Sequence, residues 1–205
     1  KGPLAEAAFQ SRASSITLDY KNGELDPDPK ELDKIDIEKF GGSGRYVFNS
    51  GWLVDASYSQ LELDPKSKGA DSIDVDVWSI GGGKYLNENT TLVFTYSNID
   101  PDEIDDLDRY EVELQHLCQA SWGAVKLNAS YGLVDIDDED DIDIYGLSAT
   151  YYWNNNLGFG VSYKNDSDVE LFDEVETYSV FSEWFITENI AVSAAYVDVE
   201  FDDED

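Results

Sequence analysis

Positively charged residues are scarce in this sequence. Lys and Arg together number 13, against 45 Asp and Glu, and the formal net charge at pH 7 is -32. A nucleic-acid partner is therefore excluded, because each phosphate contact needs a cation to neutralise it. A charge this negative is also typical of disordered chains, but 41% of the residues are hydrophobic and 13% are aromatic. A chain of that composition can bury enough apolar surface to fold.

Long apolar runs, cysteines and histidines are also lacking. No run approaches the roughly 18 uninterrupted apolar residues of a membrane-spanning helix, which excludes a helical membrane protein. Cys118 is the single cysteine, so no intrachain disulfide framework forms. With His116 as the single histidine, we expect no nucleophilic catalysis and no enzyme. Residues 1–10 carry no apolar signal-peptide segment, which fits a mature exported chain or one that is never exported.

Six segments of alternating apolar and polar residues each end on a tyrosine. By subtraction, these tyrosines are 32 to 38 residues apart, a spacing typical of repeated β-hairpins. Leu157, Phe159 and Val161, for example, alternate with smaller residues, as in a strand with one apolar face. We expect the tyrosines to form an aromatic girdle; they are Tyr20, Tyr58, Tyr96, Tyr131, Tyr163 and Tyr196.

Returning strands lie between these segments, which gives eleven predicted strands of about 10 residues each, the length needed to span a bilayer. The returning strands are predicted at residues 35–48, 72–86, 110–120, 142–153 and 177–185.

The connectors fall into two alternating classes. Five are compact turns, at residues 49–51, 87–89, 121–123, 154–156 and 187–189. Six are long and acidic, at residues 26–33, 64–71, 100–108, 135–141, 166–176 and 198–205. Tight turns at one end and long loops at the other are typical of outer-membrane barrels.

A soluble sandwich or lipocalin-like barrel also alternates apolar and polar residues, with its apolar face turned inward. Three features favour the membrane barrel instead. Charge is largely confined to the connectors, the opposite strand face carries small polar residues, and aromatic residues gather near strand ends.

With these features, residues 13–199 resemble the porin-like and small β-barrel proteins of Gram-negative outer membranes. The resemblance rests on tyrosine-terminated strands, such as residues 127–131 and 159–163, and on the rhythm of short and long connectors. It implies an all-β, antiparallel up-and-down transmembrane β-barrel in the bacterial outer membrane. We expect one domain over residues 1–205, with residues 1–12 as an N-terminal extension.

An odd number of strands predicts an unpaired edge, which hydrocarbon does not tolerate. Such proteins also usually end on an aromatic residue, whereas this sequence ends in the acidic residues 201–205. We therefore predict a parent of twelve strands whose closing strand is missing after residue 205. Different pairing of residues 1–12, or closure by another chain, are the alternatives.

Two groups of residues are candidate metal sites. Loosely bound Ca²⁺ or Mg²⁺ is the one cofactor considered, since hard cations prefer several carboxylate oxygens; the candidate ligands are Asp135, Asp137, Asp138, Glu139 and Asp141. The spacing is not that of an EF-hand, and a solvated acidic surface that bridges to lipopolysaccharide through free divalent ions is the alternative. His116 and Cys118 lack further ligands nearby, and we expect them to pack rather than to bind metal.

Charged residues within strands are candidate lumen-lining groups. They are Asp19, Asp55, Glu111, Glu113, Lys126 and Lys164, with Asp76 as a further candidate. Their acidic majority favours cations in an open pore. Alternatively, these groups pair with one another inside a plugged lumen.

The sequence thus predicts a narrow, cation-preferring diffusion channel in contact with outer-membrane lipid and lipopolysaccharide. The second hypothesis is a structural or docking barrel whose acidic loops bind an extracellular protein or divalent ions, with a homo-oligomer as another possible partnership. The third is a soluble, secreted all-β binding domain.

Overall fold

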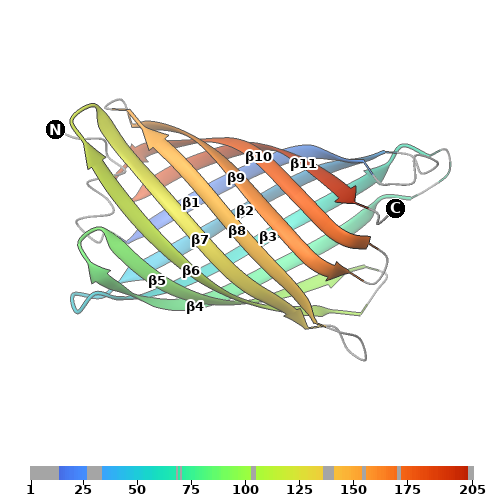
Figure 1. The fold of residues 1–205 in the computed structure, drawn as a ribbon, viewed down its shortest axis with the longest axis horizontal. Coiled ribbons are helices and arrows are strands. Elements are labelled where there is room, and N and C mark those ends of the chain that lie inside the picture. The colour runs from blue at the N-terminus through green and yellow to red at the C-terminus, as the bar shows by residue number, and fades with distance from the viewer. Residues whose placement is uncertain are drawn as a thin grey trace.

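The computed structural model is a closed barrel of eleven strands (Figure 1). The structure describes residues 14–26, 34–67, 69, 71–102, 105–135, 141–153, 156–169 and 172–202. The strands are β1 (Ser15–Asp26), β2 (Ile35–Val47), β3 (Trp52–Pro65), β4 (Ile73–Asn87), β5 (Thr90–Pro101), β6 (Leu107–Ala120), β7 (Gly123–Asp135), β8 (Ile142–Tyr152), β9 (Leu157–Val169), β10 (Phe172–Thr187) and β11 (Ile190–Asp202). Within these ranges, no helix is long and apolar enough to cross a membrane.

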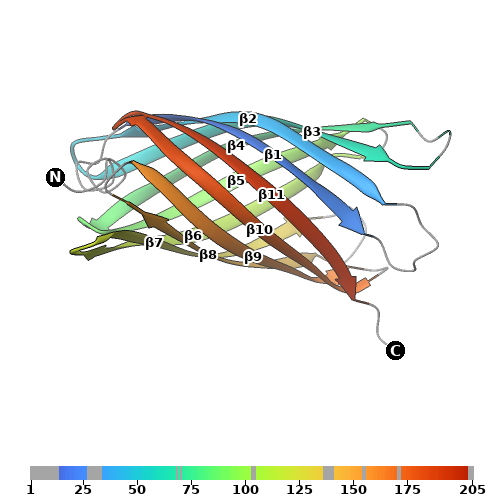
Figure 2. The same cartoon turned by 90° about the horizontal axis from the view of Figure 1, so that it is seen from above.

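The barrel closes by pairing its first strand with its last. Every other neighbouring pair follows chain order and is antiparallel, whereas β1 pairs with β11 in parallel, with Leu18 opposite Val192 (Figure 2). In an up-and-down barrel with an odd number of strands, the first and last run in the same direction, and a parallel ladder also satisfies their backbone groups. The predicted unpaired edge is therefore wrong, while a twelfth strand after residue 205 stays a prediction.

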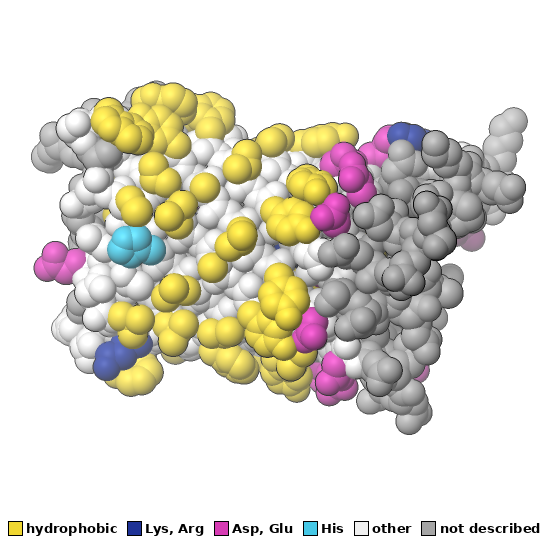
Figure 3. Space-filling view, in the orientation of Figure 1, with side chains coloured by type: hydrophobic (Ala, Val, Ile, Leu, Met, Phe, Trp, Pro, Cys, Tyr) yellow, Lys and Arg dark blue, Asp and Glu magenta, His cyan; other side chains and the backbone are white. Residues whose placement is uncertain are grey.

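The alternation along each strand places apolar side chains outside and small or polar ones inside. On β3, Val54 and Tyr58 are exposed on the outer face, whereas Asp55 and Ser57 point inward. Figure 3 shows the apolar side chains as a band across the face of the barrel wall in view. A soluble barrel would present the opposite arrangement, with its apolar face inside.

An aromatic residue from every strand marks one limit of this apolar band. The six predicted tyrosines alternate with five aromatic residues of the even-numbered strands, and rings of neighbouring strands lie in contact, for example Tyr96 and Tyr110 with centroids 5.5 Å apart. This outer girdle comprises Tyr20, Phe40, Tyr58, Trp78, Tyr96, Tyr110, Tyr131, Tyr145, Tyr163, Tyr178 and Tyr196.

Beyond the outer girdle, the polarity of the two faces reverses. On β3, Glu62 and Asp64 point outward and Leu61 and Leu63 point inward. Acidic side chains form the rim of the apolar band on that side in Figure 3. Where water replaces hydrocarbon around the barrel, the hydrophobic effect favours aliphatic side chains inside.

This reversal explains why the strands are longer than predicted. They run from 11 to 16 residues, against the expected length of about 10. Several acidic stretches predicted to be loops continue the barrel wall. Most of residues 166–176, for example, belong to β9 and β10, and residues 198–202 belong to β11.

Short turns lie at the opposite end of the barrel, as predicted. Residues 88–89, 121–122 and 188–189 each connect two strands directly. Gly51, which precedes β3, has a φ of 84°, a left-handed conformation that glycine adopts without steric cost.

Gly23 is required where β1 meets β11. A Cβ atom on Gly23 would lie 2.0 Å from the backbone oxygen of Val197, whereas one on Gly44 of β2 would lie 4.0 Å from its nearest neighbour. We expect Gly23→Ala to destabilise the folded barrel by about 1–3 kcal/mol, as overpacking does. Urea unfolding in detergent micelles measures this change. Equal unfolding midpoints for Gly23→Ala and the control Gly44→Ala would contradict the parallel closure.

Candidate functional site: the lumen

In the described part of the chain, acidic and basic side chains occur in equal numbers inside the barrel. All six predicted lumen-lining residues point inward, but Asp76 lies on the outer face. Among the side chains that the structure describes, the inward-facing acids are Asp19, Asp55, Glu111, Glu113, Asp166 and Glu183, and the bases are Lys21, Lys39, Arg45, Arg109, Lys126 and Lys164. The described set therefore carries no net charge, and the whole net charge of -32 lies outside it.

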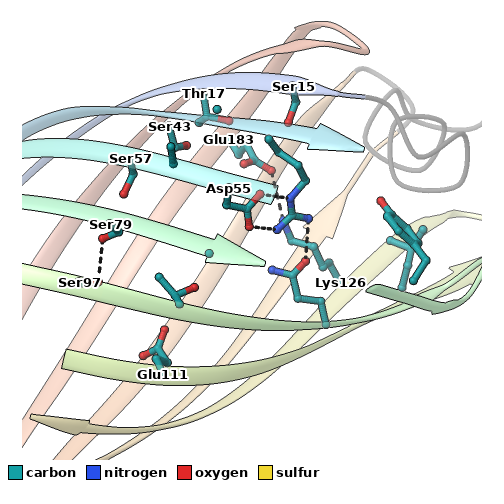
Figure 4. A pocket seen from close by; sticks show the side chains of 18 of the residues that line it. Ser15, Thr17, Ser43, Asp55, Ser57, Ser79, Ser97, Glu111, Lys126 and Glu183 are labelled. Carbon is teal, nitrogen blue, oxygen red and sulfur yellow. Dashed lines mark hydrogen bonds and ion pairs between the residues drawn. The ribbon is translucent and has the colours of Figure 1, made fainter. Parts of the chain in front are cut away.

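An ion pair extends into the lumen toward the short-turn end. Arg45 of β2 donates from Nε to Asp55 Oδ1 at 2.7 Å and from Nη2 to Oδ2 at 2.9 Å. Its Nη1 also lies 3.5 Å from Oε1 of Gln115 on β6, across the lumen (Figure 4). Gln115 in turn donates to Glu113. The contact between Arg45 and Gln115 joins β2 to β6, which are not neighbours, so these two side chains narrow the passage.

A second group reaches across from the other wall. Lys126 of β7 lies 3.7 Å from Glu183 of β10, which also accepts a hydrogen bond from the hydroxyl of Tyr152 on β8. Nearer the short turns, a buried apolar cluster comprises Val47, Leu53, Tyr85 and Val93. These side chains therefore narrow the lumen near its short-turn end.

A cavity of about 390 Å³ occupies the lumen between Lys126 at one end and Arg109 and Glu111 at the other. Its wall is rich in hydroxyl groups. Figure 4 shows several of them, including Ser43, Ser57 and Ser79, on neighbouring strands. The charged side chains are partly open to solvent: those of Arg45 and Asp55 are 21% and 24% exposed. Water therefore reaches groups in the middle of the barrel.

The outer girdle is joined to the acidic residues beyond it by a repeated hydrogen bond. Four odd-strand tyrosines each donate to a carboxylate that lies two residues from the aromatic residue opposite, a diagonal cross-strand contact. Four such bonds form, at 2.7–2.8 Å: Tyr58 to Asp76, Tyr96 to Asp108, Tyr131 to Asp143 and Tyr163 to Glu176. The phenol rings thus face the apolar band while their hydroxyls bind the acidic rim.

Carboxylates crowd the rim closely enough to repel one another. The pKa of Asp100 is raised, chiefly by the negative charge of Asp106. In one place lysines relieve this repulsion. Lys34 and Lys66 bind Glu24 at 2.5 and 2.8 Å, and hydrogen bonds from the two ammonium groups lower the pKa of Glu24 to about 2.

The candidate metal ligands of the sequence lie in two places. His116 and Cys118 are exposed on the outer face, where His116 Nδ1 lies 2.9 Å from Thr90 Oγ1. Asp135 and Asp141 flank a segment outside the described residues, which holds Asp137, Asp138 and Glu139. No group of three or more potential metal ligands occurs within the residues described.

Sequence reasoning missed half of the charged interior. It overlooked Lys39, Arg45 and Arg109 because the returning strands had been placed by their apolar residues alone, and Lys21 because the first segment was taken to end at Tyr20. A signal was available: Lys39 and Arg109 each directly precede an aromatic residue of the outer girdle, and adjacent residues of a strand point to opposite faces.

The contacts of Glu24 predict an acid-sensitive rim. Glu24 lies four residues beyond Tyr20, outside the apolar band. Because its pKa is lower in the folded protein than its ordinary value of 4.5, its stabilising effect is complete above pH 4.5 and is lost as the pH falls toward about 2. An NMR titration should find its midpoint near pH 2, and Lys66→Gln should move it upward, whereas the distant Lys84→Gln should not. A wild-type midpoint near 4.5 would contradict these contacts.

Comparison with known proteins agrees with this architecture. A search of curated protein sequences finds no significant match. A family model described as "Putative general bacterial porin" matches residues 1–121, more than half of the chain. Membership in such a family points to the bacterial outer membrane and to a channel rather than an enzyme. The chain therefore belongs to this family of general bacterial porins.

Proposed function

We propose that this protein is a narrow passive diffusion channel for small polar solutes, with a preference for cations. The observation that carries the proposal is the solvent-exposed, charged interior along a cavity of about 390 Å³. A barrel that serves only as a scaffold has no need of water at charged groups in its centre.

The preference for cations comes from the rim rather than from the lumen. The inward-facing charges balance, whereas Asp100, Asp102 and Asp106 are exposed at the long-connector end. A negative potential at the entrance raises the local concentration of cations. Because exposed charges are screened within about 3 Å at 1 M salt, the preference should weaken as salt rises.

Binding of divalent cations to the acidic connectors would supplement this role. It would link the rim to anionic headgroups of lipopolysaccharide, and a homo-oligomer or an extracellular protein could dock there. These are secondary proposals, and the crowded carboxylates around Asp100 support them.

Planar-bilayer recording of the purified, folded protein tests the channel. In a tenfold KCl gradient we expect a reversal potential of cation-selective sign, well short of the roughly 59 mV of an ideally selective pore. Neutralising the rim with Asp100→Asn and Asp106→Asn should move it toward zero at low salt. Glu188→Gln, which removes a charge at the short-turn end, is the matched control. Absence of current would overturn the proposal, and anion selectivity would overturn the role of the rim.

The narrow part of the lumen yields a second prediction. Because Arg45 spans the lumen to reach Gln115, Arg45→Ser should widen the passage and increase single-channel conductance. Lys84→Ser removes the same charge from the outer wall, where Lys84 lies over the Trp52 ring, and should leave conductance unchanged. Equal conductance for the two variants would show that Arg45 does not limit the flow.

A further inference from the structure

Four basic side chains form a ring inside the barrel at the level of the outer girdle. Each is the immediate sequence neighbour of a girdle residue: Lys21 follows Tyr20, Lys39 precedes Phe40, Arg109 precedes Tyr110 and Lys164 follows Tyr163. Since adjacent residues of a strand point to opposite faces, the aromatic rings lie outside and the cations lie inside at one height. The ring draws on β1, β2, β6 and β9.

The positive charges of this basic ring are poorly neutralised. Lys21 and Lys39 are directly opposite each other in the β1–β2 ladder, an arrangement that destabilises a sheet when the charges are alike. In the described part of the chain, neither of them nor Lys164 forms an ion pair. Arg109 binds Glu111 at 2.7 Å, yet its Nε atom is buried and has no hydrogen-bond partner among these residues.

The four cations also repel one another across the lumen. Lys39 lies within electrostatic range of Lys21 and Arg109 and also of Asp19, and Lys164 lies within range of Arg109 and Lys21 and also of Glu111 and Asp166. Buried polar and charged groups without partners are costly and are rarely retained. A ring of facing cations with an orphaned guanidinium nitrogen is therefore suited to an anionic group from outside the chain.

Carboxylates lie two residues further along the same strands, on the short-turn side of the basic ring. Asp19 and Glu111 are each two residues from a ring member, Lys21 and Arg109, on the same strand face. Two residues of a strand span roughly 6.6 Å. Asp19 forms no ion pair in the described structure. The lumen thus presents a positive layer and a deeper negative layer. On β1 the backbone spacing of the two layers is close to the roughly 7 Å length of an extended dipeptide, whereas on β6 Glu111 already contacts Arg109.

We propose that this double layer binds a small zwitterionic solute, an amino acid or a short peptide. The basic ring holds the carboxylate, and Asp19, which has no ion pair in the described structure, holds the ammonium group. A zwitterion suits both the balanced charges of the lumen and the acidic rim, which would repel a simple anion. This assignment deepens the proposed channel function, because the solute enters through the lumen.

Isothermal titration calorimetry of the folded barrel in detergent tests the double layer with three probes. Glycylglycine carries both charges, N-acetylglycylglycine carries the carboxylate alone, and glycylglycinamide carries the ammonium alone. We expect glycylglycine to bind most tightly. The double variant Lys21→Gln, Lys39→Gln should weaken its binding about tenfold or more, the loss expected for one charge-assisted hydrogen bond. Asp19→Asn should abolish its advantage over the acetylated probe.

The control variant is Lys84→Gln, which removes an equal charge from the outer wall and should leave binding unchanged. Heat-modifiability on detergent gels verifies that every variant folds. The proposal is overturned if no probe binds, if the acetylated probe binds as tightly as glycylglycine to the wild type, or if the double variant binds like Lys84→Gln. Because binding is measured without current, glycylglycine binding to a barrel that does not conduct would refute the channel and leave the site standing.

Discussion

Backbone hydrogen bonding in a medium without water is the constraint on which the rest of this structure depends. In hydrocarbon, each N–H and C=O group must find a partner within the protein, so a sheet is stable there only when it closes on itself. The barrel achieves closure with eleven strands by accepting one parallel pair, β1 with β11. Gly23 marks how closely those two strands approach, since even one added carbon would overlap the backbone of Val197. Closure then fixes which side of every strand faces lipid and which faces the lumen.

Apolar and polar side chains alternate along the strands on both sides of the outer girdle, but the apolar face changes there from the outside to the inside of the barrel. Between the outer girdle and the short turns, apolar side chains face outward because the surroundings are apolar. Between the outer girdle and the long connectors, carboxylates such as Glu62 face outward and aliphatic side chains such as Leu61 face inward. The tyrosines join the two regimes, with rings in the apolar band and hydroxyls bonded to the rim. The charges of the lumen are also layered along the barrel. The basic ring lies at the height of the outer girdle, carboxylates lie next toward the short turns, and the paired Arg45 and Asp55 lie nearer still to those turns.

Much of this architecture could be predicted from the sequence, because it depends on local periodicity. The six tyrosine-terminated segments, the short turns within the described residues and the outward apolar face all follow from alternation and turn residues. Three features could not be predicted. The parallel closure depends on contacts between residues far apart, such as Leu18 and Val192. Strand ends beyond the girdle were mistaken for loops because their outward residues are acidic. Half of the interior charges, including Arg45 and Arg109, were missed because the register of the returning strands was unknown.

Alternating accessibility along β3 in a lipid bilayer tests the central claim, that the apolar face contacts lipid and the polar face contacts water. Spin labels would be placed one at a time at residues 53–64 of a protein in which Cys118 is replaced by serine, and collisions with oxygen and with a water-soluble nickel complex would be compared. We expect labels at even-numbered positions up to Tyr58 to collide more often with oxygen than with the nickel complex. Labels at Gln60, Glu62 and Asp64 should collide more often with the nickel complex. Labels at Asp55 and Ser57 should also collide with the nickel complex, from inside the lumen. Nickel access at Val54 and Ala56 equal to that at Asp55 would contradict the membrane barrel.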